Sequence, residues 1–195
     1  MQQHRNLIVL LITLFFILSA QAHEQSNKID KDMWGFALSS GHGTEGTNAY
    51  RFAFTVPYGP TWFTSSKWPV HFNWENSLGY WRAPLNSNIT GPQSLVFLTT
   101  GPMFRVAKAL PKWGLTPFVE AGVSGSLLSE KQIGNRRLSL HFQFEDKLGA
   151  GVRFGQSQQI EFAFRLYHYS NASLNAPNSG LNLYMISFGF WLPQL

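Results

Sequence analysis

The sequence predicts an all-β protein, an eight-stranded antiparallel transmembrane β-barrel, on three observations. Large apolar side chains alternate with polar or small ones along several segments, which is the period of a β-strand. Charged residues make up 13% of the chain, whereas a soluble domain usually carries about 25%. Aromatic residues make up 15%, and tryptophans stand near the segment ends, where the interfacial girdles of barrels are aromatic: Trp34, Trp62, Trp68, Trp113 and Trp191.

Four segments in the first half of the chain have strand character and turn residues between them: 34–40, 48–58, 69–81 and 94–106. In the second segment, Tyr50 and Phe52 share one face while Arg51 and Ala53 share the other. In the fourth segment, Pro102 follows Gly101 and has no N–H to donate to a ladder. We therefore expect a bulge or bend at this point.

Four further segments complete the set: 116–128, 138–154, 158–169 and 181–191. Residues 121–126 look like a nucleophile elbow, but Ser126 replaces the last glycine of that motif and no helix follows, so they predict a strand with small inward side chains. In the seventh segment, Ile160 and Phe162 alternate with Glu161 and Ala163. Eight is the smallest usual number of strands in a closed membrane barrel, and an even number brings the ends together.

The alternation has two interpretations. In a soluble sandwich the apolar face forms the core, whereas in a membrane barrel it faces lipid and the polar face fills the lumen. The low charge content favours the barrel. Ionisable side chains on the polar face, such as Arg51, Glu75, Glu161 and Arg165, would then pair inside it, because small barrels are filled by side chains.

The N-terminus predicts export. Residues 1–22 combine a basic start, a short apolar run and small residues at a cleavage site, and we interpret them as a signal peptide. Residues 23–195 would then form the barrel domain. The chain has no cysteine, and removing Arg5 from its 15 basic residues leaves 14 against 10 acidic ones. This diffuse charge of +4 suits an anionic lipid surface and does not indicate nucleic acid.

One candidate catalytic pair follows from strand parity. If Ile160 to Leu166 alternate toward lipid, the same period places His168 and Ser170 on the outer face, where the apolar run ends. Residues two apart on a strand lie about 7 Å apart at Cα, within reach of a hydrogen bond between imidazole and hydroxyl. A His-x-Ser tripeptide alone also arises by chance where a strand ends.

The surrounding residues make the pair more specific. His168-Tyr169-Ser170-Asn171-Ala172, followed by Pro177-Asn178-x-Gly180, resembles the active-site segment of the PagL family, outer-membrane lipid A 3-O-deacylases. The resemblance in motif covers about fifteen residues. It implies a small outer-membrane barrel in which this segment joins the last two strands.

The resemblance also implies roles for individual residues. His168 would be the general base and Ser170 the nucleophile, while the backbone N–H of Asn171 would help to form an oxyanion hole. Asn178 matches an asparagine that supports the site. Ser173 stands where the family has its first glycine after the Asn-Ala pair. The resemblance would give this position a backbone role in the oxyanion hole, and the serine here departs from the family pattern.

A second departure concerns Asn182, where at least some family members have the glutamate that completes a Ser-His-Glu triad. Parity places Asn182 on the outer face of the strand expected to pair with that of His168. Its amide oxygen can accept a hydrogen bond from the imidazole and fix the tautomer, but it cannot stabilise the imidazolium with a charge. Asp146 is a candidate for that charge.

The remaining candidates indicate structural roles. Residues 145–147 predict a charge cluster in the lumen or outside the cell. His42, His71 and His141 lack metal-ligand spacing, and we expect them in the lumen or in loops. No metal or other cofactor is expected.

The sequence therefore predicts a carboxylic ester hydrolase of the bacterial outer membrane that acts on lipid A in lipopolysaccharide. Two alternatives remain at this point: a non-catalytic barrel that serves as an adhesin or structural protein, and an esterase acting on phospholipid. A monomer and a homodimer are both compatible with the sequence.

Overall fold

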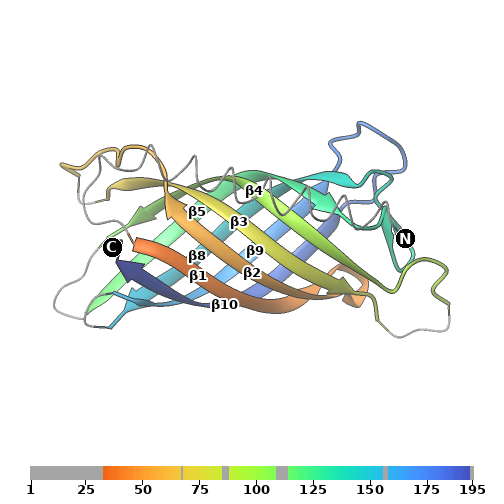
Figure 1. Cartoon of the computed structure of the whole chain (residues 1–195), viewed down its shortest axis with the longest axis horizontal. Coiled ribbons are helices and arrows are strands. Elements are labelled where there is room, and N and C mark those ends of the chain that lie inside the picture. Colours follow the sequence, from red (N-terminus) through yellow and green to blue (C-terminus); the bar gives the residue numbers. More distant parts are fainter. Residues whose placement is uncertain (1–32, 67, 85–87, 109–113, 156–157, 194–195) are drawn as a thin grey trace.

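The computed structural model describes residues 33–66, 68–84, 88–108, 114–155 and 158–193, which form a tilted-strand barrel (Figure 1). The predicted signal peptide, residues 1–22, and residues 23–32 lie outside this description. Among the described residues, no helix is long and apolar enough to span a membrane.

Eight long strands form the wall: β1 (Met33–Gly43), β2 (Asn48–Pro57), β3 (Val70–Arg82), β4 (Ser94–Ala107), β5 (Leu115–Leu128), β8 (Phe142–Phe154), β9 (Ile160–Ser170) and β10 (Leu181–Pro193). Each strand is antiparallel to both of its neighbours, and β10 pairs with β1 to close the sheet. The predicted all-β eight-stranded barrel is confirmed. Closure leaves no unpaired edge strand in the wall.

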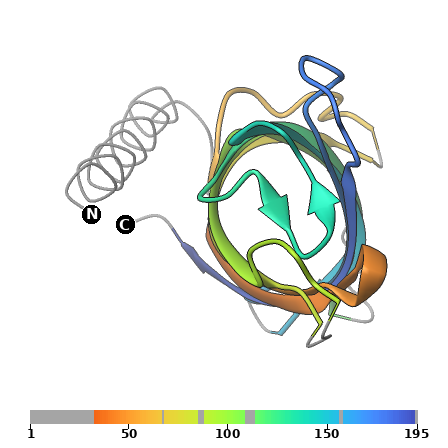
Figure 2. The same ribbon diagram turned by 90° about the vertical axis from the view of Figure 1, so that its right-hand side faces the viewer.

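The connection between β5 and β8 differs from the prediction. Residues 138–141 precede β8 rather than belonging to it, and two short strands, β6 (Gln132–Ile133) and β7 (Arg136–Arg137), form an additional hairpin. Figure 2 shows this hairpin across one mouth of the barrel. We call residues 129–141 the cap segment. Its buried Ile133 and Leu138 belong to the apolar cluster inside this end of the barrel.

A bulge or bend is expected at Gly101-Pro102 in β4, and the structure has no bulge there. The register with β5 resumes unchanged after the interruption, from Thr100 opposite Gly125 to Met103 opposite Gly122, so no residue is inserted. Gly101 and Pro102 remain paired with β3. The proline therefore interrupts one ladder without shifting it, because only one side of a strand position needs the missing N–H.

The two faces of the wall have opposite chemistry. Outward side chains are large and exposed, as in Phe162, Phe164, Ile186 and Phe188, which are 47–58% exposed. The inward face holds polar, charged and small side chains, together with the buried apolar cluster at the cap end, which includes Trp81 and Phe97. Trp191 does not belong to an interfacial girdle as expected, because parity turns it inward, where its Nε1 donates to Glu161 at 2.8 Å.

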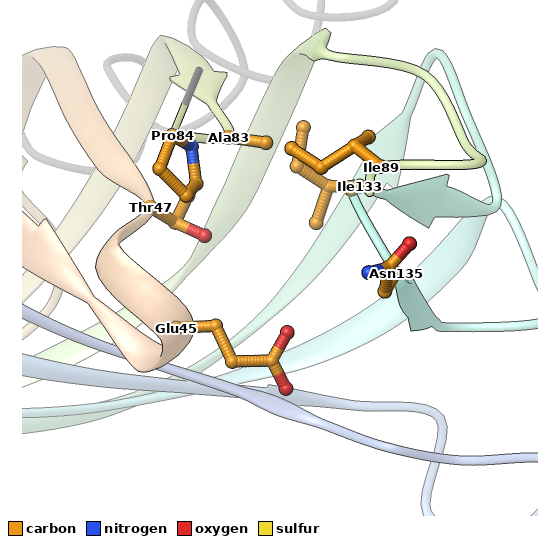
Figure 3. Close-up of a pocket in the computed structure, with 8 residues that line it drawn as sticks. Glu45, Thr47, Ala83, Pro84, Ile89, Ile133 and Asn135 are labelled. Atoms are coloured by element: carbon orange, nitrogen blue, oxygen red, sulfur yellow. The ribbon is translucent and has the colours of Figure 1, made fainter. Parts of the chain in front are cut away.

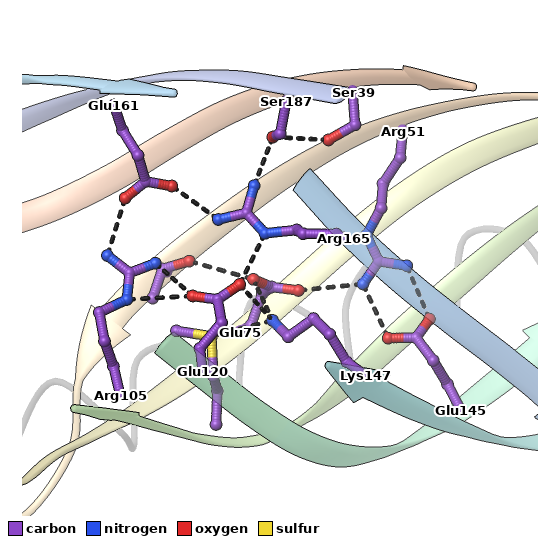
Figure 4. Close-up of polar contacts among 12 residues, drawn as sticks. Ser39, Arg51, Glu75, Arg105, Glu120, Glu145, Lys147, Glu161, Arg165 and Ser187 are labelled. Carbon is purple, nitrogen blue, oxygen red and sulfur yellow. Dashed lines mark hydrogen bonds and ion pairs between the residues drawn. The ribbon is translucent and has the colours of Figure 1, made fainter. Parts of the chain in front are cut away.

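Ion pairs fill the lumen (Figure 4). Arg165 donates to Glu120 and to Glu161, each at 2.6 Å, and Arg51 donates to Glu145 at 2.6 Å. The predicted pairing of inward charges is confirmed, and each carboxylate of the network faces at least one cation. The network contains Arg51, Arg105, Lys147, Arg165, Glu75, Glu120, Glu145 and Glu161.

Glu120→Gln tests the contribution of this network to stability. The change removes one of the two carboxylates that Arg105 and Arg165 share, the other being Glu161. It leaves the buried network with an excess positive charge, and an uncompensated buried charge costs about 3–5 kcal/mol. We expect the free energy of unfolding in urea, followed by tryptophan fluorescence in micelles, to fall by about that amount. Glu130→Gln, at an exposed position, is the matched control, and an equal effect of the two changes would contradict the prediction.

Candidate active site

His168 and Asn182 lie directly opposite each other near the ends of β9 and β10. Both side chains are exposed on the outer wall, and His168 Nδ1 is 2.6 Å from Asn182 Oδ1. The nearby outward residues of the same strands, including Phe164 before His168 and Tyr184 after Asn182, belong to the band of exposed apolar side chains around the wall, which we call the apolar belt. The pair therefore stands where the apolar surface ends.

The hydrogen bond fixes the tautomer of the imidazole. An amide oxygen can only accept, so His168 Nδ1 must carry the proton that it donates to Asn182. The other nitrogen, Nε2, is then an acceptor, as a general base requires. The sequence-predicted contact between His168 and Asn182 is thus present in the structure.

Ser170 is the last residue of β9 and follows His168 on the same outer face. Within the described part of the chain, no hydrogen bond joins the Ser170 hydroxyl to His168. Catalytic hydrogen bonds are often formed fully only when substrate is bound. Between the two residues, Tyr169 points inward and donates to Glu145 at 2.5 Å, which fixes this strand end to the lumen network.

The support residues come together in the active-site loop, which we define as residues 171–180. Asn171 is fully buried, and its Nδ2 donates to the carbonyls of Leu138 and Asn175 at 3.0 and 2.8 Å. Its backbone N–H donates to Asn178 Oδ1 at 3.3 Å. The predicted oxyanion donor therefore already faces an acceptor, although across a long hydrogen bond.

The loop begins with a turn that explains the position of Ser173. Ala172 and Ser173 have φ angles of 50° and 62°, and the N–H of Leu174 donates to the carbonyl of Asn171 at 3.0 Å. Positive φ at both central positions is the requirement of a type I′ turn, which favours glycine. Ser173 is exposed and forms part of this turn rather than being brought to His168.

Several residues that hold the site were missed by the sequence prediction. Thr44, in the short 3-10 helix η1 (Thr44–Gly46), accepts the N–H of Asn182 at 3.0 Å through its hydroxyl. Arg136 of the cap segment donates to the carbonyls of Ser179 and Gly180 at 2.6 and 2.7 Å. Gly134-Asn135 between two short extended pairs is a hairpin signal that would have located Arg136 beside the mouth.

Other predicted residues lie away from the hydrogen-bonded pair. Asp146 is the register partner of His168 in β8, but among the described residues no hydrogen bond joins the two, so Asn182 orients the imidazole. Of the three scattered histidines, His141 is in the cap segment and His71 lines the far end of the lumen. His42 is a correction, because it is exposed on β1 rather than in a loop or the lumen.

The site is an open surface rather than an enclosed pocket. The pocket in Figure 3 has a volume of about 220 Å³ and lies between η1 and the cap segment, with Glu45 and Asn135 among its lining residues. It contains none of His168, Ser170 or Asn182. A substrate for these residues must therefore approach along the outer wall.

The sequence profile described as lipid A 3-O-deacylase (PagL) matches residues 48–191, which include the last two strands and the active-site loop. This chain belongs to the PagL family. The family is one of outer-membrane enzymes that hydrolyse an ester, so the predicted enzyme class and location are confirmed.

Individual members of the PagL family agree with this assignment. The lipid A deacylase PagL of Pseudomonas aeruginosa is 30% identical over 139 residues, covering 71% of this chain and 75% of that protein. The lipid A deacylase PagL of Bordetella bronchiseptica is 31% identical over 88 residues, covering 43% and 48%.

Solved structures agree on the fold. The crystal structure of the outer membrane enzyme PagL superposes with a TM-score of 0.69 at 24% identity, covering 80% of this chain and 98% of that one. Neisserial surface protein A gives a TM-score of 0.51 at 10% identity, covering 84% and 96%. The eight-stranded barrel is therefore shared more widely than the PagL family.

Ser173→Gly tests the strained turn. Glycine adopts a positive φ without the roughly 1–2 kcal/mol penalty of a residue with a Cβ, so we expect slower amide hydrogen exchange in residues 171–175. Ser179→Gly is the control, since Ser179 is in the same loop but does not have a positive φ. Slowing in both variants, or in neither, would contradict the interpretation.

Proposed function

We propose that this chain removes the 3-hydroxyacyl chain ester-linked at position 3 of lipid A by a serine-esterase mechanism. The observation that carries the proposal is the hydrogen bond from His168 to Asn182 on the lipid-facing wall, with Ser170 two residues after His168 on the same face. Membership of the PagL family supports the substrate and the reaction. Residues 1–22 would direct export of the chain and would then be removed.

In the first step, His168 Nε2 accepts the proton of the Ser170 hydroxyl as its oxygen attacks the ester carbonyl. Asn182 keeps the imidazole in the tautomer and orientation that this transfer needs. The imidazolium then donates its proton to the departing sugar oxygen. Water attacks the acyl-serine with His168 again as the base, which releases the fatty acid and restores Ser170.

Negative charge on the carbonyl oxygen requires hydrogen-bond donors. The Asn171 N–H follows the nucleophile directly, and its 3.3 Å bond to Asn178 is long enough to be exchanged for a stronger bond to an oxyanion. The side-chain amide of Asn178 can supply a second donor. Asn171 itself is fixed by the two carbonyls that its own amide contacts.

The outer wall suits a lipid substrate. A shallow hollow of about 770 Å³, lined mainly by apolar side chains such as Leu38, Tyr50, Ile186 and Phe188, runs across the neighbouring strands. Ile186 is four residues from Asn182 along β10, about 13 Å at the rise of a strand. An acyl chain lying in this hollow would leave its ester near Ser170. The proposed site comes entirely from one chain, so a homodimer is not required.

Ser170→Ala tests the nucleophile and the substrate together. Cells producing the wild-type protein should contain lipid A lighter by one hydroxyacyl chain, as measured by mass spectrometry, and cells producing Ser170→Ala should not. Ser179→Ala, in the same loop, is a control for expression. Unchanged lipid A with acyl chains released from phospholipid would instead favour the phospholipid esterase.

Asn182 variants test the orienting hydrogen bond. Asn182→Ala removes the acceptor of His168 Nδ1, and loss of the correct tautomer should lower kcat by about 10²-fold or more. Asn182→Glu restores a charged acceptor and should raise kcat above that of the wild type. Turnover that is unaffected by Asn182→Ala would remove Asn182 from the mechanism.

A further inference from the structure

Arg136 joins three segments that surround the proposed catalytic pair. Its Nη1 donates to the carbonyls of Ser179 and Gly180 at 2.6 and 2.7 Å, and its Nη2 donates to Glu45 in η1 at 2.8 Å. The side chain of Arg136 is 15% exposed, although that of Glu45 is 56% exposed. One planar group thus fixes the end of the active-site loop to both the cap segment and η1.

The end of the loop is in contact with the proposed general base. Gly180 has a φ of +58°, and a Cβ at this position would lie 3.3 Å from His168 Cε1 and 3.9 Å from Nε2. The backbone of Gly180 therefore borders the edge of the imidazole that faces away from Asn182. Any movement of this backbone would change the space available to Nε2.

The end of the active-site loop leads directly into the strand that carries Asn182. Gly180 is followed by Leu181, the first residue of β10, and Leu181 opposite Tyr169 is the last pair of the ladder beside His168 and Asn182. Terminal pairs of a ladder open more easily than central ones. Thr44 and Glu45 are adjacent in η1, so Thr44 holds the backbone of Asn182 while Glu45 holds Arg136.

We propose that Arg136 is a positioning residue for the deacylation reaction, which acts by holding the Gly180 backbone against His168 and by preventing the end of β10 from opening. This inference rests on the proposed function, because the position of His168 affects the reaction only if His168 is the general base. The geometry favours arginine, since its rigid fork can satisfy two carbonyls and a carboxylate at once, whereas a lysine ammonium is a single point donor.

The test measures the reactivity of Ser170 directly in the full-length protein in micelles. A fluorophosphonate probe should label the wild type and not Ser170→Ala. Arg136→Gln should label about 10-fold more slowly, in keeping with the cost of small misplacements at a reacting centre. Arg136→Lys should recover only part of the rate. Arg137→Gln, whose side chain is exposed on the same hairpin, should react like the wild type.

Steady-state kinetics distinguishes positioning from other roles. The same loss of kcat, with KM changed by less than about twofold, should be seen on lipid A and on an uncharged short-chain nitrophenyl ester. A rise in KM confined to lipid A would overturn the proposal and make Arg136 a ligand for the lipid A phosphates. Loss in proportion to a lowered melting temperature would also overturn it.

The two proposals fail in different ways. A wild-type protein that is not labelled at Ser170 would overturn the proposed function and this inference with it. Labelling of the wild type at the same rate as Arg136→Gln and Arg136→Lys would overturn only the role of Arg136. If Arg136→Gln does not fold, the comparison with Arg136→Lys decides the question alone.

Discussion

The register between β9 and β10 is the constraint on which the proposed site depends. His168 and Asn182 meet because they are directly opposite and share the outer face. A slip of one residue would turn one of the strands over, placing phenylalanines in the lumen and charges in the apolar belt. Placing those side chains on the wrong face would cost free energy. The same cost therefore keeps His168 and Asn182 opposite each other.

Hydrogen bonds and ion pairs in the lumen hold the end of β9 that carries His168 and Ser170. Tyr169 lies between His168 and Ser170 in sequence but on the opposite face, and it shares Glu145 with Arg51. Alternation along β9 thus attaches the proposed catalytic residues, the exposed His168 and the half-buried Ser170, to a buried network. A strand whose inward residues are held by ion pairs can present polar residues to a membrane without local packing around them.

The sequence predicted the wall of the barrel almost completely, because the apolar and polar alternation is strong in several of the long strands and turn residues separate the others. It also predicted the contact between His168 and Asn182, since parity and the motif agreed on one face. It did not predict the cap hairpin or the roles of Arg136 and Thr44. Those contacts join loops that are distant in sequence and use backbone carbonyls, so they leave no periodic pattern to recognise.

Strand β4 shows a similar limit of prediction from the sequence. Gly101-Pro102 predicted a bulge or bend, but the register with β5 is the same on both sides of the interruption, from Thr100 opposite Gly125 to Met103 opposite Gly122. Local rules identified the weak position correctly. The effect of the proline on strand pairing depended on the neighbouring strands, whose contacts form only when the barrel closes.

The position of the site at the edge of the apolar belt has a consequence for how catalysis should be measured. A lipid that reaches His168 and Ser170 along the wall arrives by two-dimensional diffusion, so its effective concentration is its mole fraction in the leaflet. Dilution of the bulk solution would leave encounter rates unchanged, whereas dilution of the substrate with inert lipid would lower them. The fatty acid released would enter the same leaflet and compete for the same wall.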